Sequence, residues 1–157
     1  MGSSDEQRGS RPQSRRPETG AVLGIDPGAK RVGLALCHPH QRVAIGLLTF
    51  HAGHGKSFIE HLRGLLEEHN VSCIVVGHPR NMDGSSGSAA QSAESLARRL
   101  RREFGLPVEL WDERLTTSAG RHVLKGTAAP REARDRIAAT LILQSWLDRQ
   151  EGSDREA

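Results

Sequence analysis

The stretch GIDPGAKRVGLAL (residues 24–36) combines two apolar segments, a turn and one carboxylate. The apolar runs AVLGID (21–26) and RVGLALC (31–37) are joined by PGAK, a spacing that predicts two strands of a hairpin. Asp26 stands between apolar neighbours and the turn. An ionised side chain is costly there unless it faces water, pairs with a cation or holds a metal. Asp26 is therefore the first candidate for a chemical role.

The chain around this hairpin predicts three more strands and several helices. RVAIGLLTF (42–50) extends the hairpin into a three-stranded antiparallel meander. VSCIVVG (71–77) and PVELWDE (107–113) are apolar runs typical of buried strands. Apolar residues at helical spacing predict helices over 56–70, 88–105, about 117–125 and 130–150. The order β-β-β-α-β-α-β-α-α predicts an α/β fold, a five-stranded mixed sheet of a meander plus parallel strands, flanked by helices.

Composition indicates a single domain of 157 residues with a net charge of +3, which permits an anionic partner. Polar, Arg-rich residues 1–20 are predicted to be a disordered tail, 21–150 the domain, and 151–157 a loose C-terminal tail. Cys37 and Cys73 fall in apolar runs, which predicts two small buried residues in a reducing compartment. With no signal peptide and no apolar run near the ~20 residues that cross a bilayer, we expect a cytoplasmic protein with no membrane partner.

Two further acidic positions are unusual in the same way as Asp26. Asp135 lies on the last helix, and the residues three, four and seven positions further on are all apolar, so it shares the face expected to pack on the sheet. The last strand ends in Asp112 and Glu113, of which only one can face a given site. Taken singly, each has an ordinary alternative: Asp135 as a first-turn acid or an ion-pair partner, the others as a turn cap and a partner of Arg114.

Together these acids predict a metal site. Asp26, Asp135 and one of Asp112 and Glu113 come from separate elements that can meet at one edge of the sheet. Carboxylates held close together raise a pKa or require a cation. Without a Cys or His cluster, their oxygens suit Mg²⁺ or Mn²⁺. Two such ions can activate water and stabilise a leaving oxygen, so the pattern favours metal-dependent phosphodiester hydrolysis.

Four blocks carry a resemblance to a known family: GIDPGAKRVGLAL, VVGHPRNMDGSSG, LWDERLTT and DRIAATLILQSWLD. They resemble the YqgF family, also called RuvX, of ribonuclease H-like nucleases related to the RuvC Holliday junction resolvases. The similarity runs from about residue 21 to 149. It implies a ribonuclease H-like fold for residues 21–150. It also implies catalytic, metal-binding acids at Asp26, Glu113 and Asp135, with Mg²⁺ or Mn²⁺ as two-ion cofactor.

The resemblance implies nucleic acid as partner without fixing which. We expect a nuclease in 5′-end processing of pre-16S ribosomal RNA, with a Holliday junction resolvase acting on branched DNA as the alternative. An alternative of another class is a non-catalytic, nucleic-acid-binding ribosome-assembly factor. Symmetric junction cleavage would require two sites, so a homodimer belongs to the resolvase hypothesis.

Nucleic acid would be held mainly through its phosphates. Every aromatic residue, Phe50 and Phe58 included, falls in a predicted core element, so platforms for base stacking are scarce. NMDGSSGS (81–88) is either a substrate-guiding loop or a helix-entry turn with Ser88 as cap, and His78 is expected on a surface loop. The basic residues expected to contact phosphates, with solvated surface charge as the alternative, are Lys30, Arg31, Arg80 and Arg114.

Overall fold

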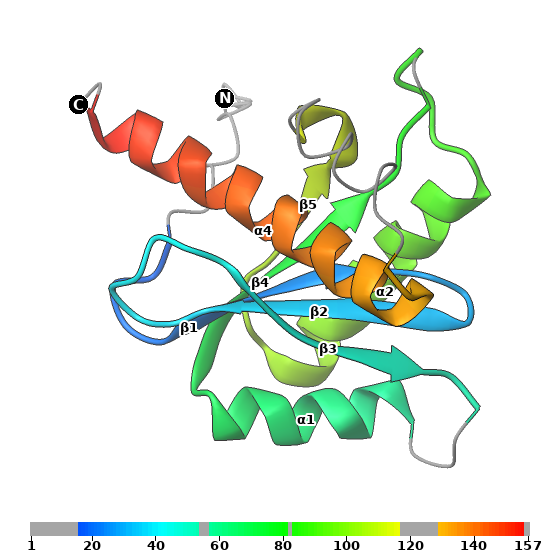
Figure 1. The fold of residues 1–157 in the computed structure, drawn as a ribbon, viewed down its shortest axis with the longest axis horizontal. Helices are drawn as coiled ribbons and strands as arrows, with labels where there is room; N and C mark the ends of the chain where they lie inside the picture. The colour runs from blue at the N-terminus through cyan, green and yellow to red at the C-terminus, as the bar shows by residue number, and fades with distance from the viewer. Residues whose placement is uncertain (1–15, 54–56, 82, 117–128, 156–157) are drawn as a thin grey trace, which may run out of the picture.

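The computed structural model describes residues 16–53, 57–81, 83–116 and 129–155. The strands are β1 (Ala21–Asp26), β2 (Arg31–Cys37), β3 (Ile45–His51), β4 (Val71–His78) and β5 (Val108–Asp112). They form one sheet in the order β3-β2-β1-β4-β5 (Figure 1). β1 is antiparallel to β2 and parallel to β4, and β5 is parallel to β4. The predicted mixed sheet, a meander extended by parallel strands, is confirmed.

The helices are α1 (Phe58–Glu68), α2 (Ser88–Phe104) and α4 (Arg131–Arg155), with a 3₁₀ turn η1 (Glu113–Leu115) after β5. Ser57 begins α1 by accepting a hydrogen bond from the backbone N–H of Glu60 at 3.2 Å. Gly105 ends α2 in the left-handed region, with φ of 64°. The short helix predicted over about 117–125 lies outside the described residues.

Helices cover both faces of the sheet. α4 lies across one face, and α1 and α2 lie on the other, as Figure 1 shows. Alternate side chains of each strand therefore enter two separate apolar clusters. Ile25 and Val32 belong to the cluster under α1 and α2, whereas Trp111 and Trp146 belong to the cluster under α4. Because Ile25 points toward α1 and α2, its neighbour Asp26 belongs to the α4 face.

The largest differences from the prediction lie at three places along the chain. α4 continues to Arg155, so residues 151–155 are helical where a loose tail was expected. β3 begins at Ile45, three residues later than predicted. Arg16, placed in the predicted tail, donates hydrogen bonds to the carbonyl oxygens of His38 and Gln41 and so is anchored to the β2–β3 connection.

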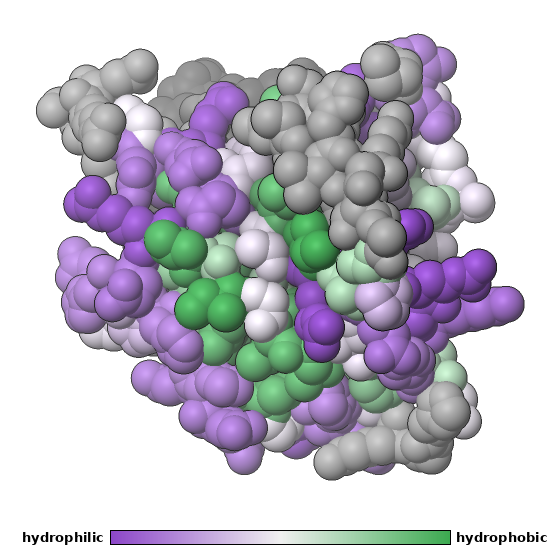
Figure 2. Space-filling model, viewed as in Figure 1, coloured by the Kyte–Doolittle hydropathy of each residue, from purple (hydrophilic) through white to green (hydrophobic). Residues whose placement is uncertain are grey.

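Cys37 and Cys73 are buried free thiols, as predicted, and burial raises the pKa of Cys73 to about 12. None of the described helices combines the length and apolarity that a bilayer crossing needs. Figure 2 shows that hydrophobic surface is mixed with hydrophilic surface on the face seen in Figure 1. Val43 and Ile45, 64% and 55% exposed, lie at the start of the edge strand β3.

Candidate active site

Asp26 is the last residue of β1, and a glycine of the neighbouring strand lies on each side of it in the sheet. Asp26 pairs directly with Gly33 of β2. On the other side Ile25 pairs with Val76 of β4, so Asp26 and Gly77 are next in register at the same edge of the sheet. Neither glycine has a side chain to fill the space over the sheet, which leaves room on both sides of the carboxyl group.

Asp135 of α4 occupies the space over Gly33. A Cβ at Gly33 would lie 2.0 Å from the carbonyl oxygen of Asp135 and 2.5 Å from its carbonyl carbon. The helix backbone therefore packs directly on the backbone of β2. This close approach, which only glycine permits, places Asp135 beside Asp26, although 109 positions separate them in the chain.

Glu113 occupies the space over Gly77. A Cβ at Gly77 would lie 2.9 Å from Oε1 of Glu113, which is the first residue of η1. The neighbouring Asp112 takes another role, since its Oδ1 accepts the backbone N–H of Arg114 at 2.9 Å and starts the 3₁₀ turn. Of the two acids that end β5, the structure thus places Glu113 beside Asp26 and turns Asp112 toward Arg114.

The three acids form a partly buried cluster of carboxyl groups around Asp26. The pKa of Asp26 is raised to about 7, first by burial and then by the charges of Glu113 and Asp135. A hydrogen bond between the carboxyl groups of Asp26 and Glu113 acts in the same direction. Such a bond needs one shared proton, which the raised pKa of Asp26 lets the pair keep up to about neutral pH. Near neutral pH the carboxyl group of Asp26 is therefore close to its pKa, so a cation could replace that proton.

Asp135 is held differently. Its Oδ2 accepts a hydrogen bond from Nε of Arg31 at 2.8 Å, and both side chains are partly buried. Arg31, predicted to contact phosphate, thus pairs with one of the acids. The other two acids share one proton at and below about neutral pH, and this proton offsets one of their two negative charges. The sequence offered no signal for the Arg31–Asp135 pair, because 104 positions separate the two residues.

The donor chemistry of this cluster suits a hard divalent ion, since all three side chains offer carboxylate oxygens. Among the described residues, no three His, Cys, Asp or Glu side chains stand ready in the geometry that encloses a metal. The pairing of Asp135 with Arg31 directs that carboxylate to the guanidinium. The raised pKa of Asp26 is the observation that fits a bound cation. A cation would relieve the repulsion among the carboxylates, as the proton on Asp26 does without it.

The other predicted basic residues lie around this edge of the sheet. Lys30 is exposed in the β1–β2 turn, and its ammonium group pairs with no other described residue. Arg114 makes a two-point ion pair with Asp112, with Nη2–Oδ2 at 2.6 Å. Arg80 donates from Nη2 to the carbonyl oxygen of Gly84 at 2.5 Å. Lys30 is thus the most available of the four for an anionic ligand.

The loop between β4 and α2 is held by its own hydrogen bonds. Asp83 accepts from the backbone N–H and the hydroxyl of Ser85, at 2.9 and 2.6 Å, and these bonds lower its pKa. The N-cap of α2 is Gly87 rather than the expected Ser88, and it makes no side-chain cap. His78 is not a loop residue either: it ends β4, is 12% exposed, and its Nε2 lies 2.9 Å from Oε1 of Glu94. Glu94 carried no signal in the sequence.

A pH effect on stability follows from Asp26. The unfolded chain loses this proton near pH 3.8, whereas the folded protein keeps it to about pH 7. Between these values the folded state binds more protons, so the contribution of Asp26 to the free energy of unfolding decreases as pH rises and is lowest above pH 7. Thermal melts without divalent ions should show this decrease, and Mg²⁺ or Mn²⁺ should raise the melting temperature more at pH 8 than at pH 5. Asp26→Asn should remove both effects, and their persistence in that variant would contradict the assignment.

Comparisons with known proteins show the family and the fold of this chain. The family model for RuvX, described as Holliday junction resolvase, matches residues 20–149. A protein of Geobacillus thermodenitrificans, named as a candidate pre-16S rRNA nuclease, is 42% identical over 133 residues, which is 81% of this chain and 96% of that protein. The T. thermophilus RuvC in complex with a Holliday junction substrate has a similar fold, with a TM-score of 0.53, 17% identity and coverage of 85% and 97%. The yeast mitochondrial Holliday junction resolvase gives a TM-score of 0.56 at 15% identity, with coverage of 91% and 83%.

Proposed function

This chain belongs to the RuvX family of Holliday junction resolvases, and on that premise we propose that it is a metal-dependent nuclease that matures the 5′ end of pre-16S ribosomal RNA. The observation that carries the proposal is the meeting of Asp26, Glu113 and Asp135 at one edge of the sheet, where burial and then the charges of the other two acids raise the pKa of Asp26 to about 7. The fold supports it, because the T. thermophilus RuvC in complex with a Holliday junction substrate has a similar fold.

In this proposal the three acids hold Mg²⁺ or Mn²⁺, and the bound ions supply the positive charge that a phosphodiester needs as it is hydrolysed. Asp26 would give up its proton to make room for a cation, and Asp135, now paired with Arg31, would supply a further carboxylate. Gly33 lets the backbone of Asp135 approach β2, and Gly77 leaves room for the side chain of Glu113. Lys30, exposed in the adjoining turn, contacts a phosphate of the substrate.

The second candidate function is resolution of branched DNA. The family description and the RuvC-like fold favour it. The names of the curated relatives favour the RNA substrate, and these relatives are far more similar in sequence than the resolvases of solved structure. Resolution would require two copies of the chain to cut opposite strands, so a homodimer is proposed only together with this second function.

A side-by-side cleavage assay tests both. The substrates are an RNA spanning the 5′ end of precursor 16S ribosomal RNA, an unrelated single-stranded RNA and a four-way DNA junction, each with Mg²⁺, Mn²⁺ or a chelator. Metal-dependent cutting of the precursor in preference to the others is the expected result. Preferential cutting of the junction would establish the second function, and binding without cutting under any metal would favour the non-catalytic assembly factor.

The two acids at the end of β5 provide a matched pair of variants. Glu113→Gln should lower cleavage by about a hundredfold, because it removes one charge from the group that faces Asp26. Asp112→Asn should change the rate only a few fold, since Asp112 faces Arg114 and its loss removes a partly exposed ion pair worth about 1 kcal/mol at most. Initial rates at saturating Mg²⁺ measure both. Equal losses in the two variants would contradict the distinction.

A further inference from the structure

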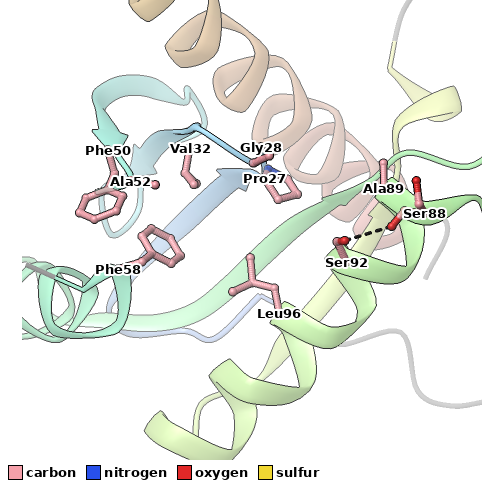
Figure 3. Close-up of a pocket in the computed structure, with 11 residues that line it drawn as sticks. Pro27, Gly28, Val32, Phe50, Ala52, Phe58, Ser88, Ala89, Ser92 and Leu96 are labelled. Atoms are coloured by element: carbon pink, nitrogen blue, oxygen red, sulfur yellow. Dashed lines mark hydrogen bonds between the residues drawn. The ribbon is translucent and has the colours of Figure 1, made fainter. Parts of the chain in front are cut away.

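A pocket of about 530 Å³ lies on the face of the sheet opposite to α4, and none of the roles proposed above uses it. Pro27 and Gly28 close one end, Phe50 and Phe58 form one side, and Ser92 and Leu96 of α2 form the other (Figure 3). The volume lies within the range of about 300–1,000 Å³ that small-molecule sites occupy. It has room for a planar ring and the sugar attached to it.

The chemistry of the lining is that of a site for an uncharged, flat group. None of the eleven described residues that line the pocket is charged. The rings of Phe50 and Phe58 pack on each other at a centroid distance of 5.2 Å and are only partly buried, so they present aromatic surface to the cavity. Ser88 and Ser92, both exposed, add hydroxyl groups at the rim. Both rings pack against the apolar core, as expected, and their partial burial leaves part of each ring facing the cavity.

The pocket lies next to the acidic cluster, on the other side of one turn. Pro27 directly follows Asp26, so the β1–β2 turn separates the two sites: the acids lie on the α4 face and the pocket on the other. Lys30 is exposed in that same turn. A nucleic acid strand that crossed this turn would meet the ammonium group of Lys30 at the turn. The carboxylates would lie on one side of it and the uncharged aromatic cavity on the other.

We propose that this pocket binds one unstacked nucleobase of the substrate, next to the phosphodiester that the acidic cluster cleaves. The proposal rests on the proposed nuclease function and adds how the substrate is held. A nucleic acid has one kind of flat, uncharged group, the base, and each base lies one sugar away from a phosphate. Base stacking on aromatic side chains tolerates any sequence, so the pocket would favour single-stranded or locally opened substrate over duplex.

The test fills the pocket from its exposed helical wall. Ala89→Leu with Ser92→Leu adds apolar side chains at two exposed lining positions of α2. The control, Gln91→Leu with Ser95→Leu, adds the same side chains at exposed positions of the same helix that do not line the pocket. Leucine favours helix, so both variants should fold, and thermal melts check this.

Binding is measured in the Asp26→Asn background to prevent cutting, with a short single-stranded RNA that carries 2-aminopurine at successive positions. The fluorescence of 2-aminopurine should change on binding at one position of the RNA. Filling the pocket should abolish that change and raise the dissociation constant of the RNA by about tenfold. An RNA with an abasic site at that position should bind the unfilled protein about tenfold more weakly than intact RNA does. The filled variant should bind the abasic and the intact RNA equally well. The control variant should behave like the unfilled protein.

The outcomes separate the two proposals. Metal-dependent cutting by the protein with unaltered α2, together with identical affinity for intact and abasic RNA, would overturn the base pocket and leave the nuclease function standing. Equal weakening by the filled and control variants would also overturn it, because the effect would then come from the helix surface. A protein that neither cuts nor binds the RNA or a DNA junction would overturn both.

Discussion

Asp26→Asn is expected to lower the rate of phosphodiester cleavage by on the order of a thousandfold, because metal ions contribute several kcal/mol to such reactions and each 1.36 kcal/mol is a factor of ten. Asp26 is the central acid: it lies between Gly33 and Gly77, with Asp135 over one and Glu113 over the other. Asparagine keeps the shape of the side chain but removes the charge that a cation needs.

The same variant should fold at least as well as the parent protein at pH 8 in chelator. Asn removes a carboxylate that burial and two neighbouring acids disfavour, and its amide can donate a hydrogen bond to Glu113. Melting temperature and cleavage rate should therefore separate. Glu67→Gln, at an exposed acid on α1, is the charge-matched control and should leave both unchanged. Wild-type cleavage by Asp26→Asn would remove the acid cluster from the mechanism.

Sequence predicts the central hairpin well because its patterns are local. The apolar runs at 21–26 and 31–37 and the turn between them match β1 and β2 residue for residue. The start of β3 is less well predicted, because 42–44 continue the apolar pattern while Arg42 and Val43 are exposed outside the sheet. The end of α4 is missed for a similar reason: a polar composition resembles a tail, although the backbone remains helical to Arg155.

For the site, sequence could nominate the acids but not their partners. Strand alternation allows one of Asp112 and Glu113 to face Asp26, yet it cannot say which without knowing the face that Trp111 occupies. In the fold Trp111 lies under α4, and Glu113, two residues later, is on the same side. The partner of Asp135, Arg31, is set by how α4 crosses β2, which is a property of tertiary packing.

Gly33→Ala is expected to destabilise the protein by about 3 kcal/mol, at the upper end of the cost of overpacking. Its Cβ would lie 2.0 Å from a backbone oxygen of α4, and a helix backbone cannot turn aside as a side chain can. To relieve the contact α4 must move away from β2, and Asp135 moves with it. A displacement of about 1 Å at a reacting centre can cost a hundredfold in rate, so cleavage should fall by about that factor under conditions where the variant is folded.

Gly64→Ala is the control that separates this close approach from glycine replacement in general. Gly64 lies within α1, and a Cβ there would meet no atom within 4 Å. Alanine should therefore stabilise the protein by about 0.5–1 kcal/mol through helix propensity and leave cleavage unchanged. Urea unfolding of both variants, with cleavage rates measured in parallel, makes the comparison. If Gly33→Ala unfolded like the parent protein and cleaved at its rate, α4 would not pack on β2 through backbone contact, and Asp135 would owe its position to something other than the missing side chain.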